Sequence, residues 1–201
     1  FFTFSALANE IAYEENKKII KWNKLDNFEV NRYYSPSSRE ELRQILKEFS
    51  EKKIKFRMIG SNHSYNDSVK NSEAIITLKN LPRVYEYRES DQTVLADSSF
   101  MMMDLMMRLD KIGRVIDGPP HHGWQSLGGA VATGSHNARK TYGALYESVI
   151  EMTILTPRGE LLKITEEEDL QIYRVSAGAL GIILDLKYHF NRPRPGQLAK
   201  E

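Results

Sequence analysis

Two short segments of the chain combine small residues, hydroxyl groups and a histidine, the residue types that bring a backbone close to a charged ligand. They read Gly60-Ser61-Asn62-His63-Ser64-Tyr65-Asn66 and Ser126-Leu127-Gly128-Gly129-Ala130-Val131-Ala132-Thr133-Gly134-Ser135-His136. Small residues permit close approach, and N–H and O–H groups donate hydrogen bonds to anionic oxygens. Because the two segments are alike in composition and remote in sequence, we expect them to hold one ligand that carries a diphosphate.

In the first segment, Gly60 permits a tight turn after a strand, and the side chains that follow it can donate to phosphate or to ring carbonyls. His63 stands where a nucleophilic imidazole would be held against the ligand. The segment lacks the Gly-Lys-Ser/Thr ending of a P-loop, and no G-x-G-x-x-G opens a helix as in a Rossmann fold. The alternative interpretation is a polar surface turn that happens to contain a histidine.

The second segment is too rich in small residues for an ordinary packed helix, because each glycine inside a helix costs about 0.5–1 kcal/mol. Close contact between the backbone and a ligand would favour Gly128, Gly129 and Gly134. A tight contact between a helix and a sheet would favour them as well. His136 is a weaker candidate, since a lone histidine beside a glycine-rich run is often a structural residue.

The remaining histidines do not predict a metal site. His121 and His122 are adjacent, but no carboxylate or third histidine follows at a spacing that zinc sites use. His189 lies in an alternating terminal strand, which is typical of a surface residue or a hydrogen-bonded core residue.

Composition excludes several classes of protein. The 201 residues include 28 basic and 27 acidic ones, a net charge of +1, so no surface for nucleic acid is indicated. No apolar run reaches the roughly 18 residues that a membrane span requires. Cysteine is absent, which excludes disulfides, thiolate metal sites and cysteine nucleophiles. This length suits one large domain or two small lobes that share an interface.

The compartment stays open between the cytoplasm and export. The chain begins with Phe1 rather than Met, so we expect its natural start to lie upstream. Ala6-Leu7-Ala8 matches the small-residue pattern at which signal peptides are cleaved. A frayed terminus or the end of a helix is the alternative interpretation.

The elements before Pro82 must position the first segment. Alternating and helical apolar patterns predict a strand at 28–34, a helix capped by Ser37 or Ser38 that runs to about Lys52, and strands at 54–59 and 74–78. The helix carries acidic residues in its first turn and the apolar stripe Leu42, Ile45, Leu46 and Phe49. The strand at 54–59 ends at Gly60, where the first segment begins.

The elements after Pro82 must position the second segment. We expect hairpins at 84–87 with 93–96 and at 149–156 with 161–164, a helix at 100–112, a short acidic helix opened by a Thr165–Glu168 capping box, and a strand at 182–190. Five methionines in the 100–112 helix indicate adaptable core filling. The predicted division is an extension at 1–19, a first subdomain at 20–81, a second at 82–191, and a linker or tail at 192–201.

Taken in order, these features resemble the FAD-binding domain of the vanillyl-alcohol-oxidase superfamily, the PCMH type. They are most similar to alditol oxidases and to sugar-lactone oxidases of the gulonolactone and arabinonolactone kind. The resemblance covers about residues 20–190 and depends on four landmarks. These are Pro36-x-x-x-Glu40-Glu41-Leu42, Gly60-x-x-His63-Ser64, Ser126 to His136, and Ala177-Gly178-Ala179-Leu180-Gly181-Ile182.

The resemblance implies an α+β fold of two α/β subdomains, with FAD lying extended between them. It implies that His63 bonds covalently to the 8α-methyl group of the flavin, and the missing cysteine excludes a second tether. The residues implied to wrap the diphosphate and the flavin edge are Gly60, Ser61, Asn62, Ser64, Tyr65 and Asn66. The residues implied for the second clamp are Ser126, Gly129, Thr133, Gly134, Ser135 and His136, with His121 and the backbone of Ile182 as further contacts.

The activity implied is oxidation of an alcohol group of a sugar alcohol or sugar lactone. Hydride passes to flavin N5, and reoxidation by O2 gives H2O2. Relatives carry a cap domain that supplies the substrate pocket and the base, and because the chain ends at Glu201 no catalytic residue can be named.

Two alternatives remain open. One is a flavin-binding module that is non-catalytic or whose substrate domain lies on a partner subunit. The other is a reductase resembling the enolpyruvyl reductases. Asn137 stands where many relatives have glycine, and asparagine tolerates left-handed backbone angles.

Overall fold

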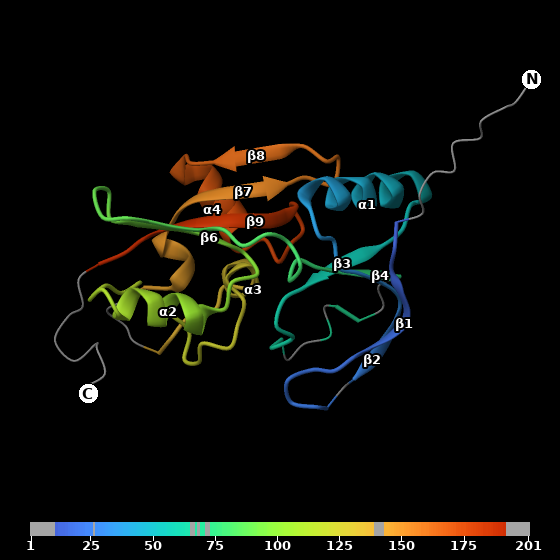
Figure 1. The fold of residues 1–201 in the computed structure, drawn as a ribbon, viewed down its shortest axis with the longest axis horizontal. Coiled ribbons are helices and arrows are strands. Elements are labelled where there is room, and N and C mark those ends of the chain that lie inside the picture. Colours follow the sequence, from blue (N-terminus) through green and yellow to red (C-terminus); the bar gives the residue numbers. More distant parts are fainter. Residues whose placement is uncertain are drawn as a thin grey trace, which may run out of the picture.

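The computed structural model describes residues 11–191 except 26, 65, 66, 68, 71, 72 and 139–142. Within these residues the chain forms two β-sheets and four α-helices (Figure 1). Tyr65 and Asn66, the cleavage pattern at 6–8 and the tail at 192–201 lie outside the described residues.

The first sheet has the strand order β1-β2-β4-β3. Its strands are β1 (Glu14–Ile19), β2 (Phe28–Tyr34), β3 (Phe56–Ile59) and β4 (Ala74–Thr77). β4 is parallel to both β2 and β3, and the long crossover that parallel strands need is supplied between β2 and β3 by helix α1 (Arg39–Lys52). The predicted strands and helix of this half are confirmed to within two residues at the strand ends.

Helix α1 follows the local signals of its sequence. The Ser38 hydroxyl accepts a hydrogen bond from the backbone N–H of Glu41 at 3.1 Å, which satisfies one of the free donors of the first turn. Lys53 ends the helix in the left-handed conformation, with φ of 54°. The predicted stripe is buried: Leu42, Ile45, Leu46 and Phe49.

Strand β1 was not predicted. We expected residues 1–19 to be an extension, yet Glu14–Ile19 pairs antiparallel with β2 at the edge of the sheet. The sequence Glu-Glu-Asn-Lys-Lys-Ile exposes most of its side chains and so lacks an apolar alternation. Charged side chains are characteristic of edge strands, where they discourage pairing with other chains, and this makes such a strand resemble a loop in sequence.

The second sheet has the strand order β5-β6-β9-β7-β8, with antiparallel neighbours. Its strands are β5 (Tyr85–Arg88), β6 (Thr93–Asp97), β7 (Val149–Leu155), β8 (Leu161–Ile164) and β9 (Ile182–His189). Both predicted hairpins and the predicted terminal strand are confirmed. The helices of this half are α2 (Met102–Asp110), α3 (Leu127–Ala132), the 3₁₀ helix η1 (Leu145–Ser148) and α4 (Glu167–Arg174).

Two details of these helices differ from the prediction. In α2 the buried face is Met102, Leu105 and Leu109, whereas Met106 and Met107 are 37% and 50% exposed, so the five methionines are not all core filling. The 3.6-residue period places Met106 and Met107 away from that face. Helix α4 begins after Glu166, which makes no side-chain capping bond, so the predicted capping box is wrong.

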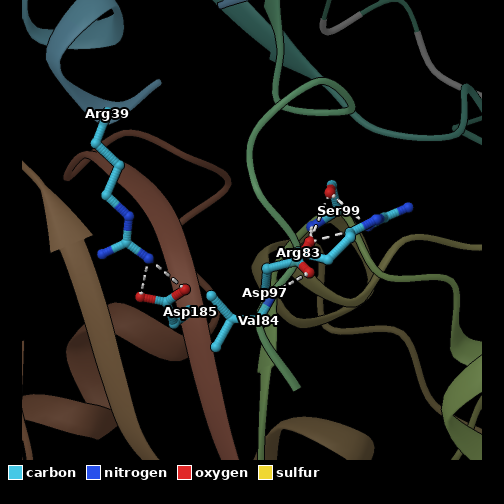
Figure 2. A network of polar contacts seen from close by, with 6 residues as sticks. All are labelled: Arg39, Arg83, Val84, Asp97, Ser99 and Asp185. Atoms are coloured by element: carbon cyan, nitrogen blue, oxygen red, sulfur yellow. Dashed lines mark hydrogen bonds and ion pairs between the residues drawn. The ribbon is translucent and has the colours of Figure 1, made fainter. Parts of the chain in front are cut away.

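The two halves share a hydrophobic core. Leu155, Ile182 and Leu184 of the second sheet belong to the same buried cluster as the apolar stripe of α1. An ion pair reinforces this contact, since one guanidinium nitrogen of Arg39 lies 2.7 Å from both carboxylate oxygens of Asp185 on β9 (Figure 2). The loops at the ends of β3 and α3 are therefore held at fixed places relative to each other.

Candidate functional site

The two segments singled out by composition meet in the structure. The backbone N–H of Ser126 donates a hydrogen bond to the hydroxyl of Ser61 at 3.1 Å. A Cβ atom added to Gly60 would lie 2.0 Å from the Ser126 hydroxyl oxygen, which is far inside contact distance. Gly60 is thus required by the close approach of the second segment, and the expected convergence of the two segments is a feature of the fold.

The second segment forms helix α3, although its glycines argued against an ordinary packed helix. Gly128 explains part of this, because its N–H donates to the carbonyl of Ser98 at 2.8 Å and a Cβ there would lie 2.7 Å from Ser98 Cβ. This is the structural alternative: a glycine that permits tight packing. Gly129 is different, because it is exposed and a Cβ there would meet Ser126 Oγ first, at 3.0 Å.

The end of α3 is a Schellman motif. Ser135 N–H donates to the Ala130 carbonyl at 2.8 Å, and Gly134 N–H donates to the Val131 carbonyl at 3.1 Å. Gly134 has a φ of +66°, which a side chain would disfavour. The positive φ at the end of α3 is therefore sufficient to explain why residue 134 is a glycine.

The polar side chains beyond α3 make local contacts. The Thr133 hydroxyl donates to the Gly129 carbonyl at 2.8 Å, and His136 Nδ1 lies 3.1 Å from the Gly134 carbonyl. Asn137 does not use the left-handed conformation; its amide donates to the Pro119 carbonyl at 3.1 Å.

The fourth landmark of the sequence, Ala177 to Ile182, begins at the C-terminal end of α3. The N–H of Ala177 donates to the carbonyl of Ala132 at 2.9 Å. Gly181 has a φ of +143°, and a Cβ there would lie 2.8 Å from the Leu155 carbonyl oxygen. Ile182 is buried and pairs with Leu155 on β7, so its side chain belongs to the shared core.

His63 lies in a small aromatic cluster at the end of the first segment. Its ring stacks on Trp22 with centroids 5.6 Å apart, and the ring of His122 lies 5.1 Å away on a tilt of 41°. His63 Nδ1 is buried and has no hydrogen-bond partner among the described residues. Burial first, and the neighbouring His122 second, lower the pKa of His63 below its ordinary value.

The contacts of Asn62 hold this cluster in place. Asn62 adopts the left-handed conformation with φ of 59°, and its carbonyl accepts from the N–H of Trp22 at 3.3 Å. Its side-chain amide donates to the Ile20 carbonyl at 3.4 Å. Sequence reasoning missed Trp22 and the place of His122 beside His63, and the prediction that His121 contacts the cofactor stays a prediction. The signal that could have identified Trp22 was the presence of a tryptophan in a polar stretch of sequence.

Two hollows in the structure lie away from these residues. One of about 10 Å³ lies between the two halves beside Arg39 and Asp185, and one of about 360 Å³ lies over β1 and β2 beside Tyr13 and Arg32. Within the described part of the chain, no three His, Asp or Glu side chains gather where they could hold a metal ion. None of the described helices has both the length and the apolar character that a membrane crossing needs.

The sequence profile of the FAD-binding-domain family matches residues 30–165, more than half of the chain. The chain belongs to this family. It resembles a solved structure of alkyldihydroxyacetonephosphate synthase with a TM-score of 0.70 at 18% identity, over 84% of this chain and 33% of that one. The fold is the PCMH-type FAD-binding fold predicted from the four landmarks.

Similar curated proteins are sugar-lactone oxidases. L-gulonolactone oxidase of Scyliorhinus torazame is 26% identical over 168 residues, covering 82% of this chain and 38% of that protein. L-gulonolactone oxidase of Bos taurus is 27% identical over 76% of this chain and 35% of that protein. D-arabinono-1,4-lactone oxidase of Kluyveromyces lactis is 27% identical over 76% of this chain and 30% of that protein. The chain thus spans about a third of the length of these relatives.

Proposed function

We propose that this chain is the FAD-binding part of a flavin-dependent oxidoreductase that oxidises an alcohol group of a sugar lactone or a sugar alcohol. Membership of the FAD-binding-domain family and similarity to two kinds of lactone oxidase support this class. The observation that carries the proposal is the junction of Ser61 with Ser126, which joins two small-residue segments into one surface.

We infer a particular place for the diphosphate. Gly60 and Ser126 are in close contact, and the proposed site for the diphosphate is the exposed surface over this contact. The exposed side of α3 carries Gly129 and Thr133 there, which gives a surface without bulky side chains. Gly129 is exposed, and an added Cβ would meet only the hydroxyl of Ser126, at 3.0 Å. An exposed glycine of this kind fits a group that must approach the backbone.

His63 is the proposed point of covalent attachment. Its buried Nδ1 lacks a partner among the described residues, and an unsatisfied buried polar atom destabilises the fold unless something binds it. With FAD bound, a ring nitrogen of His63 would form a bond to the 8α-methyl carbon, with loss of one methyl hydrogen and the histidine N–H hydrogen. This is a two-electron oxidation, for which O2 would be the oxidant and would be reduced to H2O2.

When bound, FAD supplies hydride acceptance at N5, and reoxidation by O2 yields H2O2. The contribution of this chain is to bind and orient the cofactor. A substrate pocket and a base for the hydroxyl proton are expected on a cap domain or a partner subunit.

The proposal is tested on the full-length protein. We expect a yellow protein whose flavin absorbance bleaches anaerobically with an aldonolactone, xylitol or sorbitol, and which releases H2O2 when air is admitted. Bound flavin that no such substrate reduces would favour the non-catalytic module. Flavin that is reduced only by a nicotinamide cofactor would favour the reductase.

A further inference from the structure

The turn between β1 and β2 supports the first segment. The N–H of Trp22 donates to the carbonyl of Asn62 at 3.3 Å, and the side-chain amide of Asn62 donates to the carbonyl of Ile20 at 3.4 Å. The turn also has a hydrogen bond of its own, since the side-chain oxygen of Asn27 accepts from the N–H of Lys21 at 3.3 Å. The first segment therefore rests on this turn.

Lys21 in this turn has a buried charged side chain. It is 2% exposed, and its Nζ lies 3.3 Å from a carboxylate oxygen of Asp67, whose side chain is 64% exposed. A lysine is almost never so buried without a charged partner, because removing an ammonium from water costs free energy that the partner must offset. The ion pair spans 46 positions and connects the turn to the loop just after His63.

Asp67 also has a partner within its own loop. The Nζ of Lys70 lies 2.8 Å from the same carboxylate oxygen, and the N–H of Lys70 donates to the Asp67 carbonyl at 2.9 Å. Hydrogen bonds from Lys70 first and from Lys21 second lower the pKa of Asp67, so the carboxylate is ionised at neutral pH and holds both ammonium groups. Lys70 shapes the loop from within, whereas Lys21 joins the loop to the turn.

Stability of the fold does not require a charge at Lys21. Replacing a buried ion pair with apolar side chains is often neutral or stabilising, because the cost of desolvation can exceed the attraction. Apolar side chains are close at hand: Ile19, two residues earlier, is buried in one cluster with Ile59 and Ile75, and Val69 of the loop packs on it. A charge kept in this place indicates a role other than stability.

We propose that Lys21 is a positioning residue for the loop that binds FAD. Its side chain is too buried to contact a ligand, so its effect passes through Asp67. The ammonium of Lys21 holds Asp67, and this keeps Asn62 and His63 against the turn in the arrangement that the cofactor meets. The inference rests on the proposed binding of FAD by this chain.

The test compares Lys21→Met in the full-length protein with Lys70→Met, which removes the local partner of the same carboxylate. Methionine keeps most of the volume of the side chain without its charge. Apoprotein from riboflavin-starved cells is titrated with 8-demethyl-FAD, which lacks the carbon that His63 would bond, so that binding stays reversible. Lys21→Met should weaken binding on the order of tenfold, and Lys70→Met by less than about threefold, because its pair lies within the loop.

The same variants are unfolded in urea without flavin. Lys21→Met should keep or exceed the free energy of unfolding of the unaltered protein, because the buried ammonium is gone and Asp67 still has Lys70. A merely structural role predicts weaker binding together with lower stability, and that result would overturn the inference. Unchanged binding by Lys21→Met would overturn it as well.

Asp67→Asn shows whether Lys21 acts through this carboxylate. In the Asp67→Asn background, Lys21→Met should cause little further loss of binding, since the interaction that it removes is already weakened. Losses that simply add would contradict action through Asp67.

A readout without flavin separates this inference from the proposed function. The backbone amide of Trp22, which bonds to Asn62, should exchange its hydrogen faster in Lys21→Met by on the order of tenfold, while the amides of α1 stay unchanged. If the unaltered protein binds no FAD, the proposed function is wrong, and this exchange still decides the role of Lys21. An unaltered exchange rate at Trp22 would end the inference on its own.

Discussion

Asp97 on β6 and Asp185 on β9 lie directly opposite each other in the second sheet, and both are almost completely buried. Like charges at opposing positions of a sheet are destabilising unless each is compensated. Asp185 is paired with Arg39, and Asp97 accepts from Arg83 at 3.0 Å and from the hydroxyl of Ser99 at 2.6 Å (Figure 2). The pair thus ties the second sheet to α1 and to the segment that joins the two halves.

Removal of Arg39 should destabilise the protein in a pH-dependent way. Burial raises the pKa of Asp185, and Arg39 partly opposes this. Arg39→Ala should lower the free energy of unfolding at neutral pH by about 1–3 kcal/mol, because it leaves a buried carboxylate without its partner.

The pH dependence of this loss has a definite sign. A carboxyl whose folded pKa is raised binds protons more tightly in the folded state, so its favourable contribution is present at low pH and is lost as pH rises through the folded pKa. The deficit of Arg39→Ala should therefore shrink in acid. Urea unfolding at pH 7 and pH 4.5 measures it, and Lys47→Ala, which alters an exposed pair on the same helix, should change stability by less than about 0.5 kcal/mol.

The contact between Gly60 and Ser126 predicts a coupled pair of substitutions. Gly60→Ala should destabilise the fold by about 1–3 kcal/mol, since its Cβ would overlap the Ser126 hydroxyl. Ser126→Gly should restore part of this loss in the double variant. Denaturant unfolding of the four proteins of this cycle gives the coupling energy, and additive effects would contradict the contact.

Two adjacent glycines of α3 should respond differently to the same change. Gly129→Val should weaken FAD binding roughly tenfold or more, about 1.4 kcal/mol, and it should destabilise the apoprotein less than Gly128→Val does, because an added Cβ meets only the Ser126 hydroxyl, at 3.0 Å. Gly128→Val should instead lower the stability of the apoprotein, because its side chain would meet Ser98. Titration with FAD and urea unfolding distinguish the two, and equal FAD affinity of Gly129→Val would remove the proposed diphosphate surface.

His63→Ala should leave the flavin extractable. After acid precipitation of the full-length protein, flavin should appear in the supernatant of this variant, while in the unaltered protein it stays with the pellet. His189→Ala serves as the control and should behave like the unaltered protein. Flavin that stays in the pellet of His63→Ala would identify a different attachment residue.

The elements that could be predicted from the sequence are those whose stabilising interactions join residues close together in the chain. Helix α1 was predicted with its cap because Ser38, Glu41 and the apolar stripe all lie in one continuous stretch of sequence, residues 38–49. Strand β1 was missed because its pairing with β2 leaves almost no local trace in a charged edge strand.

The site was predictable as two segments but not as a geometry. The different roles of Gly128 and Gly129 depend on Ser98, which lies about thirty residues earlier and packs on only one of them. The place of the His122 ring beside His63 depends on how one turn packs on α2, and no spacing rule reports this. The pairing of Arg39 with Asp185 spans 146 positions and has no local signature.

The side chains of Leu155, Ile182 and Leu184 reach from the second sheet into the packing beneath α1, so the described residues of the two halves share one continuous core. The dinucleotide proposed for this site would then bind to a surface that is already assembled, without closure of the two halves. Binding would then cost the chain little conformational entropy, and the backbone of the apoprotein should already match that of the FAD-bound protein.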